Sequence, residues 1–223
     1  MSTHISQAAE DYLKALLLEG EGQGTELVST TALAGRMGVS AASATNMLKK
    51  LAGLGLVEHL PYRGARLTDA GRRVALEVVR HHRLLETYLA EALGVPWDEV
   101  HAEAEVLEHV LSERLEERIS SLLGDPKFDP HGHPIPSKDL AMPRASERHL
   151  WSVGPGEKVA VDRVSDTVPE ALRYLGRVGI RPGTLIEVIE RGPVNGPLYV
   201  RVAGDETSRH ALSRELAEAV WVA

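Results

Sequence analysis

Nine consecutive residues of this chain, 101–109, read HAEAEVLEH and contain two histidines and three glutamates. Imidazole nitrogens and carboxylate oxygens are ligands of divalent metal ions, and charged side chains are rarely buried without partners. On a helix with about 100° per residue, the two histidines, Glu105 and Glu108 fall on one arc beside an apolar stripe. This spacing indicates either a metal site or the solvated face of a glutamate-rich helix.

A second pair of potential ligands precedes this segment. His82 and Glu86 are four residues apart, so a helix would project both from one face. The chain contains no cysteine, which rules out thiolate ligands. Neutral imidazole with carboxylate suits Mn²⁺ or Fe²⁺ better than a structural zinc site.

Two long helices are expected to carry these residues. The first covers residues 69–93 and stops at Gly94, and the second covers residues 97–123 after Pro96, a residue favoured in a first helical turn. Neither helix can bury its apolar face alone, so we expect a homodimer. The expected core positions of the second helix are Val100, Ala104, Leu107, Leu111 and Leu115.

The N-terminal region has the pattern of a winged helix-turn-helix. Short amphipathic helices are followed by Ser40, the expected cap of a recognition helix that reaches residue 54, and by two short strands around the turn PYRG. The net charge is −7 overall but +5 over residues 36–73, whereas residues 82–123 carry −7. The local positive charge favours a nucleic-acid partner over the alternative of a protein–protein module.

The recognition helix begins with small and polar side chains that suit a major groove. The candidates for base contacts are Ser40, Ala42, Ser43, Thr45 and Asn46. The candidates for phosphate contacts are Lys49, Lys50, Arg63 and Arg66.

With the pattern of the C-terminal region, the expected fold class is mainly α with a C-terminal β domain. Short β-branched runs separated by Gly and Pro predict a small SH3-like β-barrel after a Pro-rich linker. The expected domains are 1–73 (winged helix-turn-helix), 74–124 (helical dimerisation and metal binding), 125–149 (linker) and 150–223 (SH3-like). Without an apolar run of membrane length or a signal-peptide pattern, we expect a cytoplasmic protein and no membrane partner.

The block HHRLLE…VHAEAEVLEH followed by DPHGHPIP resembles the DtxR/MntR family of metal-dependent repressors, and the resemblance covers essentially the whole chain. It implies a core metal site formed by Asp11, His82, Glu105, Glu108 and His109. It also implies a second site near His82 that includes Glu86, His101, Asp129 and His131. A further ligand from the C-terminal domain is left open between Asp162, Asp166 and Glu170. A Pro-stiffened linker with exposed histidines is the alternative for DPHGH.

Two positions bear on the choice of metal. Asp11 and Glu105 stand where iron-selective members of the family carry Met and Cys, as in the manganese-responsive members, so the resemblance implies Mn²⁺, with Fe²⁺ as the alternative. Lys14 stands where two-domain manganese regulators carry a second carboxylate. A closely bridged two-metal cluster is therefore not expected, and Lys14 is a candidate for neutralising surplus carboxylate charge.

The function implied by the resemblance is a homodimeric regulator that binds a palindromic double-stranded DNA operator when metal is bound, as a repressor of metal uptake genes. One rival is a winged-helix regulator of an organic ligand, which would need an apolar pocket between the dimer helices. Another is a metallohydrolase, but the chain has no HExxH motif, nucleophile elbow or P-loop, so we expect no enzyme. The chain also has too few aromatic residues for a C-terminal domain that binds Pro-rich peptides.

Overall fold

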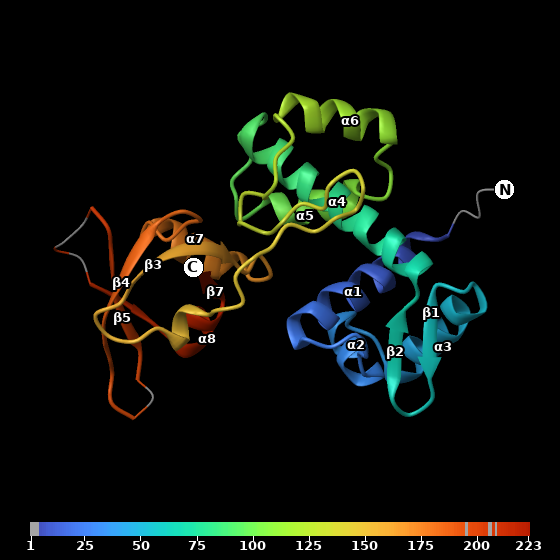
Figure 1. The fold of residues 1–223 in the computed structure, drawn as a ribbon, viewed down its shortest axis with the longest axis horizontal. Helices are drawn as coiled ribbons and strands as arrows, with labels where there is room; N and C mark the ends of the chain where they lie inside the picture. The colour runs from blue at the N-terminus through green and yellow to red at the C-terminus, as the bar shows by residue number, and fades with distance from the viewer. Residues whose placement is uncertain (1–4, 195, 205–206, 208) are drawn as a thin grey trace. The chain divides into compact units, whose positions relative to one another are not determined.

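The computed structural model describes residues 5–194, 196–204, 207 and 209–223, which form two compact units (Figure 1). The N-terminal unit comprises residues 1–81, 108–111 and 136–141. The C-terminal unit comprises residues 82–107, 112–135 and 142–223. The long helix α4 (Asp69–Glu91) contributes residues to both units.

The N-terminal unit is a winged helix-turn-helix, as predicted. Its elements before α4 are α1 (Gln7–Gln23), α2 (Thr30–Arg36), α3 (Ala41–Gly53), β1 (Val57–Leu60) and β2 (Gly64–Leu67). Serine hydroxyls start the two helices of the helix-turn-helix: Ser29 accepts a hydrogen bond from the backbone N–H of Ala32, and Ser40 accepts one from that of Ser43. These caps satisfy N–H groups that a helix leaves unpaired, and so define where α2 and α3 begin.

The prediction of a second long helix is wrong. Residues 97–123 form two helices, α5 (Val100–Leu107) and α6 (Glu113–Leu122), separated by a turn. The hydroxyl of Ser112 accepts a hydrogen bond from the backbone N–H of Leu115 and so caps a new helix start. The apolar periodicity continues across this break, which is why the sequence pattern conceals it.

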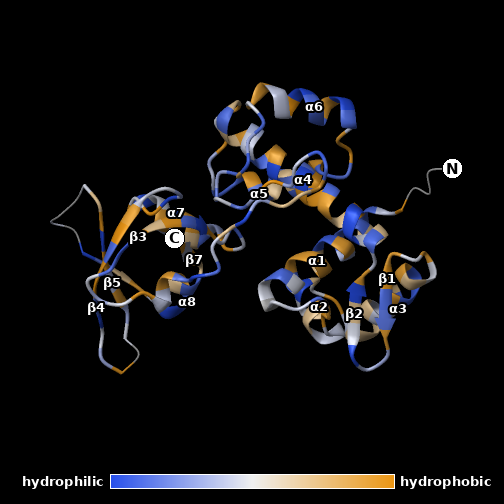
Figure 2. Ribbon diagram, viewed as in Figure 1, coloured by the Kyte–Doolittle hydropathy of each residue, from blue (hydrophilic) through white to orange (hydrophobic). Residues whose placement is uncertain are grey.

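The core expected along that helix is therefore only partly correct. Val100 and Ala104 are fully buried, but Leu107 is 37% exposed and Leu115 is 50% exposed. Figure 2 shows apolar and polar residues mixed along α6. Because large apolar side chains remain exposed on this helix pair, including Val106, these helices have a surface that a partner subunit could cover.

The C-terminal β domain is a small five-stranded antiparallel sheet with strand order β6-β5-β4-β3-β7, which confirms the SH3-like prediction. Its elements are a 3₁₀ turn (Leu150–Ser152), β3 (Lys158–Val164), α7 (Pro169–Arg177), β4 (Leu185–Arg191), β5 (Leu198–Val202), β6 (His210–Leu212), α8 (Arg214–Glu218) and β7 (Val220–Val222). Ile186, Val188 and Val200 are buried in its core, and Trp97 belongs to the same hydrophobic cluster.

Arginine side chains cover aromatic rings of this domain. The guanidinium carbon of Arg191 lies 4.0 Å from the ring centre of Trp151, and that of Arg163 lies 4.4 Å from the ring centre of Trp221. Covered rings do not form the aromatic groove of a Pro-peptide module. Among the described residues, no helix is long and apolar enough to cross a membrane.

Candidate metal centres

The C-terminal unit gathers His82, Glu86, His101 and Asp166 into one group, here called the His82 cluster. Nε2 of His82 lies 3.0 Å from Oε1 of Glu86 and 3.0 Å from Nδ1 of His101. The same His101 nitrogen lies 3.1 Å from Oε1 of Glu86 and 3.5 Å from Oδ2 of Asp166. Helix α4 presents the first two residues one turn apart, α5 contributes His101, and Asp166 follows β3. One donor atom from each residue lies within 4.8 Å of the others.

A second group, here called the loop cluster, consists of Asp129, His131 and His133 in the segment before the Pro-rich stretch. Oδ1 of Asp129 accepts hydrogen bonds from the backbone N–H groups of both histidines, at 2.8 and 3.0 Å. Nε2 of His131 donates to the backbone oxygen of Trp97 at 2.7 Å, which leaves Nδ1 available as a ligand atom. The imidazole of His131 is fully buried, so the interpretation of DPHGH as a linker with exposed histidines is wrong.

The two clusters adjoin each other and contain buried polar atoms that lack hydrogen bonds. Nδ1 of His131 lies 3.8 Å from Oε2 of Glu86, and Nδ1 of His133 lies 3.7 Å from Oδ2 of Asp166. Within the described part of the chain, Oε2 of Glu86, Oδ2 of Asp129 and Nδ1 of His131 are buried without a hydrogen-bond partner. Such orphan atoms are costly unless a further group satisfies them. A divalent cation fits this donor set.

Histidine and carboxylate charges stabilise each other in these clusters. Burial raises the pKa of Glu86, but the charge on His82 and hydrogen bonds from neighbouring histidines outweigh it and hold this pKa well below its usual range. Burial lowers the pKa of His131, but the carboxylates of Glu86 and Asp129 outweigh it and raise the pKa to about 9. Protonated imidazole therefore balances carboxylate charge when no metal is present.

The N-terminal unit holds a separate group, the Asp11 cluster, formed by Asp11, Glu108 and His109. Nε2 of His109 lies 2.8 Å from Oδ1 of Asp11 and 3.5 Å from Oε1 of Glu108. The other ring nitrogen, Nδ1, lies 2.6 Å from a carboxylate oxygen of Glu10. A carboxylate on the second nitrogen of a histidine orients the ring and makes the first nitrogen the better metal ligand.

Lys14 neutralises one carboxylate of the Asp11 cluster. Its Nζ donates to both carboxylate oxygens of Glu108, at 2.7 and 2.9 Å, and both side chains are almost fully buried. The prediction that Lys14 compensates surplus negative charge is confirmed by this contact. Lys14 lies one turn after Glu10 and Asp11 on α1, which explains how one helix supplies both the acids and the ammonium.

The five residues implied for the core site are divided between the two units. Asp11, Glu108 and His109 meet in the N-terminal unit, whereas His82 and Glu105 belong to the C-terminal unit. There Nδ1 of His82 lies 3.8 Å from Oε1 of Glu105, which is half exposed.

Of the three open candidates for a C-terminal ligand, the structure brings Asp166 into the His82 cluster. Asp162 instead accepts a hydrogen bond from the backbone N–H of Ser146 at 2.8 Å, and Glu170 pairs with Arg173 at 2.6 Å. Sequence reasoning also missed two residues. His133 stands two positions after the nominated His131, and Glu10 is adjacent to Asp11, so the motif spacing contained a signal for both.

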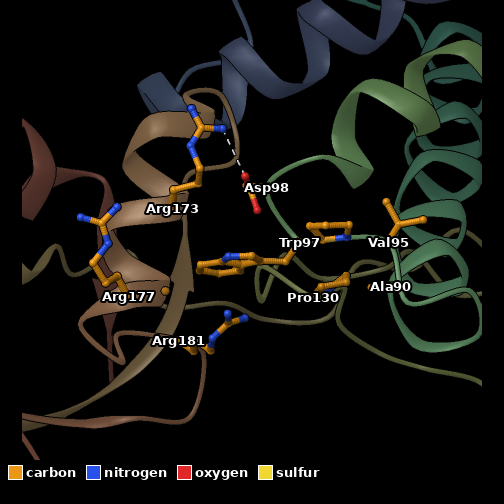
Figure 3. A pocket seen from close by; sticks show the side chains of 10 residues that line it. Ala90, Val95, Trp97, Asp98, Pro130, Arg173, Arg177 and Arg181 are labelled. Carbon is orange, nitrogen blue, oxygen red and sulfur yellow. Dashed lines mark hydrogen bonds and ion pairs between the residues drawn. The ribbon is translucent and has the colours of Figure 1, made fainter.

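A cavity of about 500 Å³ lies next to the loop cluster, between the segment before α5 and helix α7 (Figure 3). Trp97 stacks on His131 with 5.7 Å between ring centres, and the guanidinium of Arg181 lies 4.2 Å from a Trp97 ring centre. Asp98 pairs with Arg173 at 3.2 Å, and Arg177 lines the same space. This charged cavity does not match the apolar pocket that a regulator of an organic ligand would need.

The nominated DNA contacts lie on the recognition helix and the hairpin. Most of their side chains are exposed, and Thr45 is half-buried with its hydroxyl donating to the backbone oxygen of Ala41 at 2.7 Å. Ser40 serves as the cap of α3. Arg66 forms an ion pair with Glu58 at 2.6 Å, which reduces the positive charge it offers to a phosphate.

Three family models match consecutive parts of the chain. An iron dependent repressor N-terminal DNA-binding domain matches residues 4–65, an iron dependent repressor metal-binding and dimerisation domain matches residues 68–137, and a FeoA domain matches residues 148–223. The iron-dependent repressor IdeR of Mycobacterium tuberculosis is 39% identical over 98% of this chain and 97% of its own length. The diphtheria toxin repressor of Corynebacterium efficiens is 31% identical over 85% of this chain and 86% of its own.

Solved structures of metal-dependent repressors are similar to this chain over nearly its whole length. A manganese-dependent transcriptional repressor in complex with manganese is 44% identical, with a TM-score of 0.87 over 96% of this chain and 98% of that one. ScaR with bound Zn²⁺ is 32% identical, with a TM-score of 0.80 and coverage of 96% and 98%.

A winged helix-turn-helix, a metal-binding and dimerisation domain, and clusters of side chains with the chemistry to hold a metal ion together define a metal-dependent, DNA-binding transcriptional repressor. The chain belongs to the family of the iron-dependent repressors and the diphtheria toxin repressor.

Proposed function

We propose that Mn²⁺ is the metal that activates this repressor, with Fe²⁺ as the second candidate. The observation that carries this proposal is the donor set: every side chain in the Asp11, His82 and loop clusters offers nitrogen or oxygen, and the chain has no cysteine. Hard oxygen donors favour Mn²⁺, whereas soft sulfur ligands favour other transition metals. The 44% identical repressor solved with manganese supports the same choice.

The proposed core site uses Asp11, Glu108 and Nε2 of His109, which Glu10 orients. The family resemblance adds His82 and Glu105 to this set. The proposed second site consists of the His82 and loop clusters, with Asp166 as the ligand from the β domain. Buried atoms of Glu86, Asp129 and His131 in these clusters have no hydrogen-bond partner, and a metal ion would satisfy them. A bound divalent cation would supply the positive charge that holds these clustered carboxylates together.

The core ligands come from elements with different tasks. Asp11 lies on α1, within the winged helix-turn-helix, whereas Glu108 and His109 lie in the turn between the dimerisation helices α5 and α6. When these residues bind one metal ion, α1 is fixed to that turn. The recognition helix, which packs with α1, is then fixed as well. If the fixed arrangement is the one that fits the operator, metal and DNA raise each other's affinity by the same factor.

We further propose that the operator is palindromic, that the regulated genes serve metal uptake, and that the protein acts in the cytoplasm as a homodimer without catalytic activity. The exposed apolar side chains of α5 and α6 support a second copy. The chain carries no recognised hydrolase motif, and the Asp11, His82 and loop clusters resemble sites for holding an ion rather than a substrate.

The test is a DNA-binding titration. Protein stripped with a chelator is mixed with labelled duplexes from upstream of its own gene and of manganese transporter genes, and fluorescence anisotropy is followed as Mn²⁺, Fe²⁺ or Zn²⁺ is added. Saturable binding that appears with Mn²⁺ and disappears with chelator supports the proposal. Binding that ignores metal would refute it and would favour the regulator of an organic ligand.

A further inference from the structure

The tip of the β1–β2 hairpin carries an unusual residue. Leu60 accepts a hydrogen bond from the backbone N–H of Arg63 at 3.0 Å, closing a four-residue turn in which Pro61 and Tyr62 are the central residues. Tyr62 has φ +63°, the left-handed conformation of the third position of a type II turn, where glycine is favoured. Its side chain is also completely exposed. A large aromatic side chain is thus held in solvent on a backbone conformation that disfavours it.

The base of the hairpin is fixed. The backbone of Val28 exchanges two hydrogen bonds with Ala65, both 2.9 Å long, so a third segment pairs with β2. Gly64 approaches this segment so closely that a Cβ atom would lie 2.1 Å from the backbone oxygen of Val28. The tip therefore projects from a rigid support at the edge of this unit (Figure 1).

The tip is also positively charged. Arg63 is exposed and has no carboxylate partner among the residues that the structure describes. Arg66, further from the tip, is paired with Glu58. An exposed ring beside an uncompensated guanidinium is the combination that binds the sugars, bases and phosphates of a nucleic acid.

We infer that Tyr62 is a DNA-contacting residue: its ring packs into the minor groove beside the major groove entered by α3, while Arg63 binds the adjacent phosphates. This rests on the DNA-binding function of the family. The strained backbone conformation is retained because the ring is needed at the tip, and the turn alone would be better served by glycine.

The principal test compares Tyr62→Gly with the wild type on a duplex selected from a random-sequence pool by the Mn²⁺-loaded wild-type protein. We expect the variant to bind this duplex about tenfold more weakly, because the apolar contact of the ring with the minor groove is lost. Its thermal unfolding temperature without DNA should not fall, because glycine suits the turn. Unchanged affinity would overturn the inference. Failure of the wild type to select any DNA would instead refute the function on which the inference rests.

Val194→Gly is the matched control. Val194 also has a positive φ, +55°, and is 99% exposed, but it lies in the β domain after β4. This substitution relieves the same kind of backbone strain, so it should leave DNA affinity unchanged. An equal loss of affinity in both variants would show that the effect of Tyr62→Gly is not a contact at the hairpin tip.

Salt dependence separates the two roles at the tip. Tyr62→Gly should weaken binding by the same factor at every salt concentration, whereas Arg63→Ala should lower the slope of log affinity against log salt by about one. Tyr62→Phe should keep wild-type affinity because the ring, not the hydroxyl, makes the contact. A Phe variant as weak as the Gly variant would contradict packing of the ring.

Discussion

Replacing Lys14 by methionine separates the internal cation of the Asp11 cluster from the metal ion. The substitution keeps an unbranched apolar stem and removes the ammonium that donates to both carboxylate oxygens of Glu108. Glu108 is 1% exposed, so water does not replace the lost partner. The metal-free variant keeps the buried Glu108 carboxylate without its ammonium partner, and His109, whose Nε2 lies 3.5 Å from Oε1 of Glu108, remains beside it.

The size of the effect follows from this burial. Removing one partner of a buried ion pair costs about 3–5 kcal/mol of folding free energy. For a chain of this length, that loss lowers the thermal midpoint by about 6–20 °C. If Glu108 is a metal ligand, a divalent cation supplies the missing positive charge, so saturating Mn²⁺ should recover most of the loss.

The assay is thermal unfolding followed by circular dichroism, with and without Mn²⁺, for the wild type, Lys14→Met and the control Lys50→Met. Lys50 is exposed on α3, so its replacement should leave the midpoint unchanged in both conditions. A Lys14→Met midpoint equally low with and without Mn²⁺ would refute the assignment of Glu108 as a metal ligand. An undiminished midpoint in the metal-free variant would refute the importance of the buried pair itself.

Three further predictions concern the two proposed metal sites. Asp11→Ala should weaken Mn²⁺-dependent DNA binding measured by anisotropy while light scattering still reports a dimer; unchanged metal activation would contradict the proposed core site. Gly132→Ala should abolish ion binding at the second site, counted by equilibrium dialysis, because Gly132 has φ +88° and a Cβ there would lie 2.2 Å from the backbone oxygen of Asp162; retained stoichiometry would show that the loop tolerates displacement. The pKa of His131 is raised from 6.5 to about 9, so its protonated form stabilises the metal-free protein below pH 6.5 and this contribution is lost as pH rises through about 9. Because His131 must release that proton to bind metal, calorimetry should show Mn²⁺ affinity at this site rising with pH up to about 9, and a flat profile would argue that His131 is not a ligand.

Local patterns predicted the elements well where the chain itself contains the signals. Ser29 and Ser40 mark helix starts, and the strands on either side of the PYRG turn follow from alternation around a Pro–Gly stretch. The break between α5 and α6 was missed because apolar spacing continues through it. The structure shows Glu108 and His109 engaged with α1 side chains at that point, and such long-range contacts leave no local periodicity.

In the candidate site too, local patterns were predictable from the sequence and long-range contacts were not. Ligand pairs within one helix, such as His82 and Glu86, could be proposed from spacing. Asp166 could not be chosen over its neighbours, because its position depends on how the loop cluster meets β3. That register is set by a backbone hydrogen bond from Val164 to the oxygen of His131, between residues far apart in the sequence.

The tryptophan fluorophores of the protein are distributed unevenly between its two units. Trp97, Trp151 and Trp221 are its only three tryptophans, and all belong to the C-terminal unit. Trp97 stacks directly on His131 of the loop cluster. Of the three, Trp97 therefore lies beside the proposed second site, and paramagnetic Mn²⁺ bound there would quench its emission. The Asp11 cluster has no tryptophan in its own unit. Quenching of Trp97 emission would therefore follow the occupancy of the proposed second site without any label attached to the protein.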